Sequence, residues 1–316
     1  MDNYTIIRQQ NPQPPDIRPF CQHGFLFNER DHLRQQAGGQ FYLLTALNQT
    51  TQLAEARCAF FIRSNEAISP AAAPFGSVEF AETLPELVLD TFLNSLIDFA
   101  YSAKATLLRI VNYPTCYAPK QATILTISLL KYGFHIQETS QNFFLPITNQ
   151  PFDCSIAPAE RRRLRKCRDA DFQFIHWATP NLYKVTEFLQ KTRRQKGYPL
   201  TLSPEQLIKL VQSFPEQFIV FAVESKAKLV ALTVAVRVRH DILYNFLPAS
   251  HIDYQTFSPM VMLIDGLFSY CQQQQIRLLD LGVALDNNRQ PKPGLIRFKR
   301  NLGAKESPKL IFEKQL

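Results

Sequence analysis

Glycine is scarce in this chain, and so is tryptophan: 10 glycines and one tryptophan occur among 316 residues. So few glycines argue against phosphate-binding loops, which need several of them close together. The six cysteines are widely scattered and none stands in a C-x-x-C pair, which argues against a zinc or redox motif. We therefore expect no metal site, and we interpret the cysteines as small core residues or free thiols.

Membrane-directing segments are also missing from the sequence. No apolar run reaches the length of a membrane span, and the N-terminus lacks the basic and then apolar stretches of a signal peptide. We therefore expect a cytoplasmic, reducing location and no integral membrane segment.

The charge balance of the chain is basic. The net charge is +8, from 35 Lys and Arg against 27 Asp and Glu, within an ordinary globular composition of 46% hydrophobic and 20% charged residues. This excess favours anionic partners such as nucleotides, phosphorylated carriers or tRNA, or it serves solubility alone. At 316 residues the chain has room for two domains of ordinary size.

The same order of elements is predicted twice along the chain. Each copy has a strand pair, a helix that begins near a proline, a buried strand, a helix that ends at a glycine, and a last strand. In the first copy these are 41–47 and 57–65, a helix after the capping-box pattern of Thr83 and Glu86, 106–111, 121–132 before Gly133, and 134–147. In the second copy they are 217–224 and 229–239 with a third strand at 242–247, a helix from Ser258 and Pro259, 276–283, 294–302 before Gly303, and 309–313.

We interpret this repetition as a structural duplication, although strand–helix units are common enough for such a match to arise by accident. It predicts an α/β fold with mixed sheets in two domains, 1–153 and 154–316. Residues 1–40 are polar and rich in proline, and we expect them to wrap the surface without forming a core. A basic helix over 157–166 opens the second domain, either as an exposed linker or as a contact for tRNA or a nucleotide.

Motifs in the second copy carry a more specific resemblance. RLLDLGV at 277–283 and GLIRFKRNLGA at 294–304 are similar to a D-x-G strand followed by a GL-x-x-F-K-x-x-x-G closing helix. The stretch 244–263 is similar to an aromatic strand, a polar loop and a helix-starting proline. In these motifs the chain resembles the FemAB family of peptidoglycan-bridge aminoacyltransferases, which have two GNAT acyltransferase domains in tandem. The resemblance covers 158–316 in detail and the first copy by element order alone.

The resemblance implies an N-acyltransferase that moves an activated acyl or aminoacyl group to an amine acceptor, in a cleft between the two GNAT-like domains. Its co-substrate would be an acyl-CoA or an aminoacyl-tRNA, with no tightly bound cofactor, and its acceptor a small or nucleotide-linked molecule. The amine would attack the carbonyl directly, because no Cys or Ser stands in a recognisable nucleophile motif. The GNAT phosphate-cradling pattern Q/R-x-x-G-x-G/A is absent before Thr83 and before Ser258, which argues against acetyl-CoA in its usual pose.

Three residues of the closing strand and helix are candidates for the chemistry, with Gly282 beside them. The resemblance places Phe298 and Lys299 beside the reacting carbonyl, where a lysine stabilises a developing oxyanion. Alternatively, Lys299 is a surface lysine of a basic helix. Asp280, flanked by leucines on its strand, is either a paired structural acid or a base with a raised pKa. Gly282 either lets a ligand approach closely or marks a bulge.

The residues expected to bind substrate fall into two groups. One is a basic cluster that would clamp a diphosphate or simply end a solvated helix: Arg193, Arg194, Lys196 and Tyr198. The other lies on the strand that would open toward the acyl donor and in the loop behind it: Tyr244, Asn245, Tyr254 and Ser258. Packing is the simpler interpretation for Tyr244.

Two other classes of function compete with acyl transfer. A GNAT-fold binding or scaffold protein that has lost catalysis, and that holds a nucleotide-linked or anionic ligand, would explain the missing glycine pattern. A basic nucleic-acid-binding module is the third class, but the basic residues are not interleaved with aromatic motifs of a known RNA-binding type. The sequence specifies neither the acyl group, nor the acceptor, nor the oligomeric state.

Overall fold

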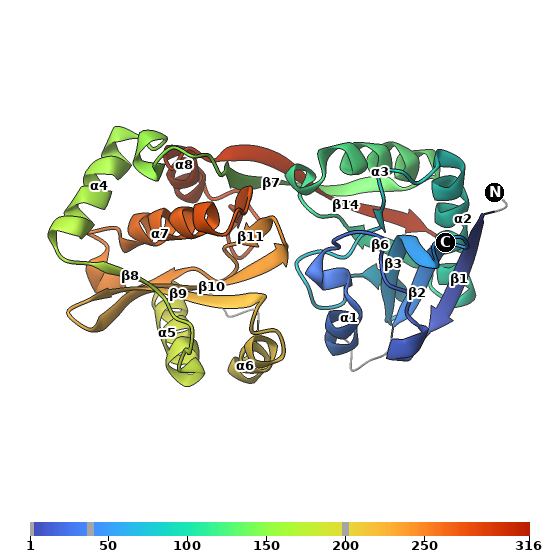
Figure 1. Cartoon of the computed structure of the whole chain (residues 1–316), viewed down its shortest axis with the longest axis horizontal. Helices are drawn as coiled ribbons and strands as arrows, with labels where there is room; N and C mark the ends of the chain where they lie inside the picture. Colours follow the sequence, from blue (N-terminus) through green and yellow to red (C-terminus); the bar gives the residue numbers. More distant parts are fainter. Residues whose placement is uncertain (1–2, 37–40, 198–201) are drawn as a thin grey trace. The chain divides into compact units, whose positions relative to one another are not determined.

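The structure is a computed structural model of the whole chain, and it describes residues 3–36, 41–197 and 202–316 (Figure 1). The chain divides into two compact units: unit 1 is Met1–Gln141 with Ser307–Leu316, and unit 2 is Asn142–Glu306. Each unit is a mixed sheet with helices packed on it, so the predicted α/β class is confirmed. No helix in the described ranges combines the length and the apolar character that a membrane crossing requires.

Unit 1 is built on a sheet of order β1-β2-β3-β4-β6-β14. Its strands are β1 (Tyr4–Gln10), β2 (Tyr42–Asn48), β3 (Leu53–Arg63), β4 (Glu66–Ser69), β6 (Leu107–Val111) and β14 (Lys305–Gln315), with β5 (Glu79–Phe80) beside β3. Only β4 and β6 run parallel among these neighbours. The helices are α1 (Arg30–Gln36), α2 (Glu86–Ser102) and α3 (Pro119–Lys131). Leu96 of α2 and Leu125 of α3 share one core with Phe312 of β14.

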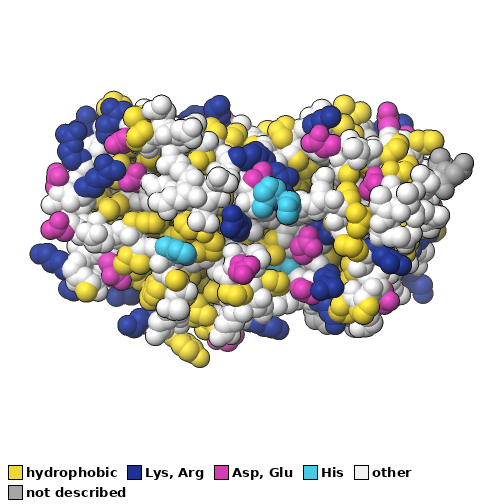
Figure 2. Space-filling model, viewed as in Figure 1, with side chains coloured by type: hydrophobic (Ala, Val, Ile, Leu, Met, Phe, Trp, Pro, Cys, Tyr) yellow, Lys and Arg dark blue, Asp and Glu magenta, His cyan; other side chains and the backbone are white. Residues whose placement is uncertain are grey.

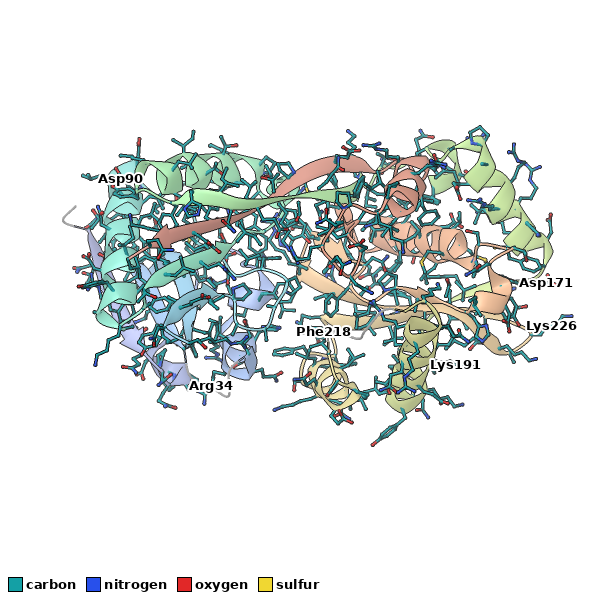
Figure 3. The ribbon with its side chains drawn as sticks, turned by 180° about the vertical axis from the view of Figure 1, so that it is seen from behind. Arg34, Asp90, Asp171, Lys191, Phe218 and Lys226 are labelled. Carbon is teal, nitrogen blue, oxygen red and sulfur yellow. The ribbon has the colours of Figure 1, made fainter. Side chains whose placement is uncertain are left out.

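Unit 2 is built on a sheet of order β7-β13-β11-β10-β9-β8. Its strands are β7 (His135–Pro146), β8 (Gln173–His176), β9 (Phe218–Ser225), β10 (Lys228–Arg239), β11 (Ile242–Tyr244) and β13 (Leu278–Val283), with β12 (Ala249–Ser250) beside β10. One face carries α4 (Pro158–Asp169), α7 (Pro259–Gln273) and α8 (Pro293–Asn301). The other face carries α5 (Leu182–Gln195) and α6 (Pro204–Ser213), as Figures 1 and 3 show. Short 3-10 turns lie at Pro14–Asp16, Leu26–Asn28, Thr115–Tyr117, Phe152–Cys154 and Ile252–Tyr254.

The last strand of each copy extends into the other compact unit. β7 ends the first copy, yet its residues 142–146 pair with β13 and belong to unit 2. β14 ends the second copy, yet residues 311–315 pair with β6 in unit 1. The expected order of elements is present in both copies, but the expectation that each last strand completes its own copy is wrong. The division into domains 1–153 and 154–316 stays a prediction, distinct from these compact units.

The expectation that residues 1–40 form no core is also wrong. β1 pairs with β2 along its whole length, and Phe25, Phe27 and Leu33 are buried. The described part of this segment is therefore integral to unit 1, although its sequence is polar and rich in proline.

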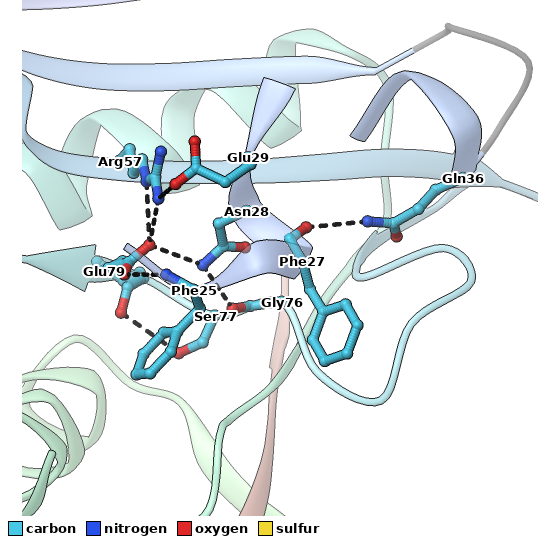
Figure 4. Close-up of polar contacts among 10 residues, drawn as sticks. Phe25, Phe27, Asn28, Glu29, Gln36, Arg57, Gly76, Ser77 and Glu79 are labelled. Carbon is cyan, nitrogen blue, oxygen red and sulfur yellow. Dashed lines mark hydrogen bonds and ion pairs between the residues drawn. The ribbon is translucent and has the colours of Figure 1, made fainter. Parts of the chain in front are cut away.

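A buried arginine explains why this segment is ordered (Figure 4). Arg57 of β3 donates to Glu79 at 3.0 Å and to Glu29 at 2.7 Å. Glu79 in turn accepts from the backbone N–H of Phe25 at 2.8 Å and from the side chain of Asn28 at 3.2 Å. A buried charge is tolerated only when partners satisfy it. Glu79 and Glu29 supply those partners. Through Glu29 and the hydrogen bonds of Phe25 and Asn28 to Glu79, the network fixes residues 25–29 to β3 and β5.

Most of the predicted helix boundaries are confirmed, and one is wrong. Ser203 and Gln206 form a complete capping box at the start of α6. The box expected at Thr83 does not form, because Pro85, with an extended backbone, is itself the N-cap of α2 and leaves Thr83 outside the helix. Gly133 and Gly303 both have φ of +79° just after α3 and α8, which confirms them as helix ends.

Because β14 crosses into unit 1, two core substitutions that lie close in sequence should destabilise different units. Phe312 and Leu302 are both fully buried, the first in the core of unit 1 and the second in that of unit 2. Truncation of either residue to Ala leaves a cavity and costs about 2–5 kcal/mol of stability. In hydrogen exchange, Phe312→Ala should reduce protection of β6, and Leu302→Ala should reduce protection of β13. Equal loss in both strands from either variant would contradict the assignment of β14 to unit 1.

Candidate active site

A cavity opens in unit 2 where two parallel strands separate. β11 and β13 pair through Tyr244 and Asp280, and the N–H of Asn245 still donates to the carbonyl of Asp280 at 2.8 Å. Beyond this point the chain turns to β12, which pairs with β10, while β13 continues beside β7. The space between the diverging segments is a cavity of about 520 Å³, lined by residues from both of them and from α5, α7 and α8.

The lining of this cavity is apolar and positively charged. It includes the apolar side chains of Phe246, Met260, Ile264, Leu281, Val283, Leu285, Leu295, Phe298 and Leu302. It also includes four cations: Arg193, Lys196, Lys292 and Lys299. No Asp or Glu is among the lining residues in the described part of the chain. Such a pocket suits a ligand with an apolar portion and a negative charge.

Gly282 shapes the floor of the cavity. Its φ of +73° lies in the left-handed region, and the register between β13 and β7 shifts between Asp280 and Gly282. Its N–H donates to Oδ1 of Asp280 at 2.7 Å, and its carbonyl accepts from Nζ of Lys299 at 2.9 Å. This glycine therefore lies at a bulge, lines the cavity, and connects the two charged residues of the site.

Asp280 is a paired buried acid. It is 2% exposed, and its Oδ1 accepts a second hydrogen bond, from the Asn142 side chain at 2.8 Å. Asp280 does not line the cavity, so it lies behind Gly282 and holds that backbone in place. Sequence reasoning missed Asn142, because it belongs to β7, which ends the first copy of the repeat.

Lys299 is buried, which excludes the interpretation as a surface lysine. It is 6% exposed, and its Nζ donates to the carbonyls of Gly282 and Val283, both at 2.9 Å. The ring of Phe143 lies 5.4 Å from the same nitrogen. Burial lowers the pKa of Lys299 to about 8, and the charge of Asp280 opposes that shift. The side chain is therefore a lysine that titrates close to neutral pH.

Tyr244 and Arg193 form part of the cavity wall. A Cβ added to Gly282 would meet the ring of Tyr244 at 3.2 Å, so this ring packs directly on the glycine. Burial and the charge of Asp280 raise the pKa of Tyr244, and Arg193 lowers it. Burial lowers the pKa of Arg193, and no carboxylate in the described ranges lies within ion-pair distance of its guanidinium.

Lys196 adds to the same positive wall. It donates to the hydroxyl of Ser250 at 3.1 Å. Its pKa is lowered by burial and then by the charges of Lys292 and Arg193. The three cations therefore lie close enough to influence one another.

Asn245 presents an unusual side chain. It is 5% exposed and lines the cavity, and its Oδ1 is buried without a hydrogen-bond partner among the described residues. An unpaired buried acceptor costs about 1–3 kcal/mol.

The remaining predicted site residues do not line this cavity. Arg194 is exposed on α5, and Tyr198 lies outside the described residues. Tyr254 packs on Phe172 and His251, with ring centroids 6.0 and 5.9 Å apart. Ser258 is the N-cap of α7, with φ of +55° and no side-chain capping bond. The structure thus brings together Lys299, Phe298, Gly282, Tyr244, Asn245 and Arg193, with Asp280 behind them.

Several backbone N–H groups in the turn before α7 are already used within that turn. Pro259 at the first helical position has no N–H, and five backbone N–H groups of the turn already donate to carbonyls within it: those of Tyr254, Gln255, Phe257, Ser258 and Val261. From α4, Lys166 donates to the carbonyl of Thr256 at 3.0 Å and Cys167 to that of Phe257 at 3.1 Å. Figure 2 shows further basic side chains gathered over α4. Part of the basic linker is therefore structural.

Among the described residues, no three His, Cys, Asp or Glu side chains are grouped as metal ligands would be. The cations and the apolar wall of the cavity suit an organic anion instead.

Comparison with known proteins agrees with this geometry. Residues 159–300, which contain most of the cavity lining, match the family described as acetyltransferase (GNAT) domain. The crystal structure of FemX is similar over 93% of this chain and 93% of that chain, with a TM-score of 0.72 and 12% identity. The chain has a FemX-like tandem GNAT fold.

Two further solved structures are similar to this chain at low identity. A conserved protein of unknown function from Bacteroides thetaiotaomicron has a TM-score of 0.59 at 13% identity, over 92% of this chain and 90% of its own. A tandem GNAT protein from the clavulanic acid biosynthesis pathway has a TM-score of 0.52 at 10% identity, over 87% and 82%. No curated protein matches the sequence. The fold predicted from the FK helix and the repeated elements is thus confirmed.

The conformation of Gly282 predicts a specific sensitivity. Gly282→Ala should destabilise the fold by about 1–2 kcal/mol for the left-handed backbone alone, because L-residues are strained there. Contact with Tyr244 should add to that loss. Gly294→Ala is the matched control: a Cβ there meets no atom within 4 Å and sits in α8, so we expect no loss and up to about 1 kcal/mol of gain. Chemical denaturation of both variants measures the difference, and equal stability would contradict the assigned strain.

Proposed function

We propose that this chain is an N-acyltransferase whose reaction centre is the cavity of unit 2. The observation that carries the proposal is the buried ammonium of Lys299 on the cavity wall, at the point where β11 and β13 separate in a GNAT domain. Apolar lining beside it suits an acyl chain, and the acyl donor would be an acyl-CoA or another carrier that ends in phosphate. The acceptor is an amine.

Hydrogen-bond capacity assigns Lys299 its role. A protonated lysine has three donors, and two of them are used by the carbonyls of Gly282 and Val283. The third is available to the oxygen of a carbonyl that is under attack, where it stabilises the oxyanion. A neutral lysine has only two donors, and both are already engaged. Only the charged form can therefore act, and burial keeps its pKa at about 8.

The reaction needs no covalent intermediate on the protein. The nitrogen of the amine forms a bond to the carbonyl carbon, the electrons of the carbonyl collect on its oxygen near Lys299, and the bond to the carrier then breaks. The carrier leaves with the electron pair and takes up the proton that the amine gives up. Phe298 and Leu281 line the cavity with Lys299 and exclude water from the carbonyl.

The anionic end of the donor is assigned to Arg193, Lys196 and Lys292. These cations line the same cavity, whereas five N–H groups of the turn before α7 donate to carbonyls of that turn. Side-chain cations would thus replace the backbone cradle that the sequence lacks. A cleft between the two domains, tRNA and nucleotide-linked acceptors stay predictions of the sequence resemblance.

A binding protein without catalysis is the competing function, and the occupied turn before α7 favours it. The two functions differ in turnover. Thioester or ester cleavage that depends on an added amine supports transfer, whereas ligand binding without any cleavage, over a panel of acyl-CoAs, aminoacyl esters and amines, supports the binding protein.

Lys299 should be required for turnover and dispensable for folding. Lys299→Met should reduce kcat about 10²–10³-fold, the usual cost of a lost oxyanion donor. Arg297→Met is the matched control on the same helix, because Arg297 is exposed and does not line the cavity. Steady-state kinetics and circular dichroism measure both effects. Unchanged kcat in Lys299→Met, with a folded protein, would remove Lys299 from the mechanism.

The pH dependence follows from the same residue. Its pKa lies at about 8 in the fold, so the active, protonated form is present below that pH and is lost as the pH rises through it. We expect kcat to fall above about pH 8 with a single ionisation. The arginine of Lys299→Arg does not titrate in this range, so any activity that this variant retains should show no such fall. A kcat that keeps rising from pH 7 to 10 in the native protein would contradict the role.

Replacement of Asn245 by an apolar residue should preserve or raise the stability of the fold and lower turnover. Asn245→Leu removes a buried unpaired acceptor, so the fold should be unchanged or up to about 1–3 kcal/mol more stable. Turnover should fall, because the cavity loses the group that accepts a hydrogen bond from the ligand. Thr233→Val is the matched control, since Thr233 has an equally buried, unpaired hydroxyl that does not line the cavity. It should leave turnover unchanged. Destabilisation of Asn245→Leu with full turnover would show that Asn245 is structural.

A further inference from the structure

We propose that the cavity of unit 2 selects acyl groups that carry no positive charge. The transferred group would be a neutral or anionic acyl group, and a free aminoacyl group with its ammonium would be rejected. This inference rests on the proposed acyl transfer and specifies its substrate class.

The first ground is the sign of the charges around the cavity. Arg193, Lys196, Lys292 and Lys299 line it, and no Asp or Glu of the described chain does. A bound ammonium group would therefore face like charges from the lining, and the nearest carboxylate, that of Asp280, lies behind Gly282 outside the lining. The repulsion is strongest near Lys299, the one of these four cations that is buried.

The second ground is that the two carboxylates nearest in sequence to the cavity floor are directed elsewhere. Asp280 is 2% exposed and accepts from Asn142 and from the N–H of Gly282. Asp286 accepts from the N–H groups of Asn288 and Gln290 at 2.8 and 2.9 Å, which close its own loop. Neither residue lines the cavity.

The third ground is the position of Lys299 relative to the bond that breaks. In an aminoacyl group the α-ammonium is attached to the carbon next to the carbonyl. If Lys299 donates to the carbonyl oxygen, it faces that ammonium only a few bonds away. The buried acceptor of the site, Oδ1 of Asn245, is neutral, so it can bind an N–H group without balancing a charge.

A series of acyl groups with matched shape and different charge tests the inference. β-Alanyl-CoA, butyryl-CoA and succinyl-CoA share one carrier and similar chain lengths, and they end in an ammonium, a methyl and a carboxylate. A second pair uses another carrier, with alanyl or propionyl joined through an amide to the 3′ position of adenosine. Dissociation constants from calorimetry should be at least tenfold weaker for the ammonium member of each series, which is about 1.4 kcal/mol.

Charge variants of the wall separate this effect from shape. Lys196→Gln with Lys292→Gln should reduce the discrimination between butyryl-CoA and β-alanyl-CoA several-fold, and so should a rise in ionic strength. Lys191→Gln is the control, since Lys191 lies exposed on α5, away from the cavity lining (Figure 3). It should leave the discrimination as in the native protein.

The outcomes distinguish this inference from the proposed function. Equal or tighter binding of the ammonium members overturns the charge selection, whatever the turnover. The expected order of affinities without cleavage in the presence of amines supports the selection and overturns the transfer. Failure of every member of both series to bind overturns both.

Discussion

One residue, Gly282, organises the candidate site. Its N–H is fixed by the carboxylate of Asp280, and its carbonyl is one of the two that hold the ammonium of Lys299. The residue has a left-handed backbone, and the ring of Tyr244 packs where a side chain would be. The bulge of β13 and one of the two hydrogen bonds that hold the lysine therefore both lie at this glycine.

Burial gives the charged groups their chemical character. Lys299 lies in a mainly apolar wall, and burial there lowers its pKa to about 8. The carbonyls of Gly282 and Val283 accept two of the three hydrogen bonds that the ammonium can donate. The negative charge of Asp280, which does not line the cavity, limits this lowering of the pKa of Lys299. Lys299 therefore titrates at about pH 8, and two backbone carbonyls hold its ammonium group in place.

The exchange of last strands makes the two copies of the repeat depend on each other. Asn142, which supports Asp280, lies in the last strand of the first copy, and Phe312, at the C-terminal end of the chain, lies in the core of unit 1. The stretch 159–300 that matches the GNAT domain therefore contains most of the lining residues but not all of the support. Part of β7, a strand of the first copy, thus completes the sheet that the second copy forms in unit 2.

The sequence by itself determined the local elements and the family resemblance. Apolar periodicity, the capping box at Ser203, the glycines at 133 and 303, and the FK helix are short-range signals, and the structure bears them out. The strand exchange, the ordered segment around Phe25 and the unformed cap at Thr83 were decided only in three dimensions, because partners distant in sequence set them. Arg57 orders its segment through Glu29 and Glu79, and β7 pairs with β13 although more than a hundred residues separate them.

For the candidate site, too, some features could be predicted from the sequence and others only from the structure. Its residue types were visible in the sequence, since Lys299, Gly282, Tyr244, Asn245 and Arg193 all follow from the resemblance and from the strand and helix pattern. Burial of Lys299, the sign of the surrounding charge and the unpaired oxygen of Asn245 were not visible. They depend on which side chains meet from six separate elements, and the low dielectric around the buried Lys299 gives a residue of a basic helix the character of a candidate reaction centre.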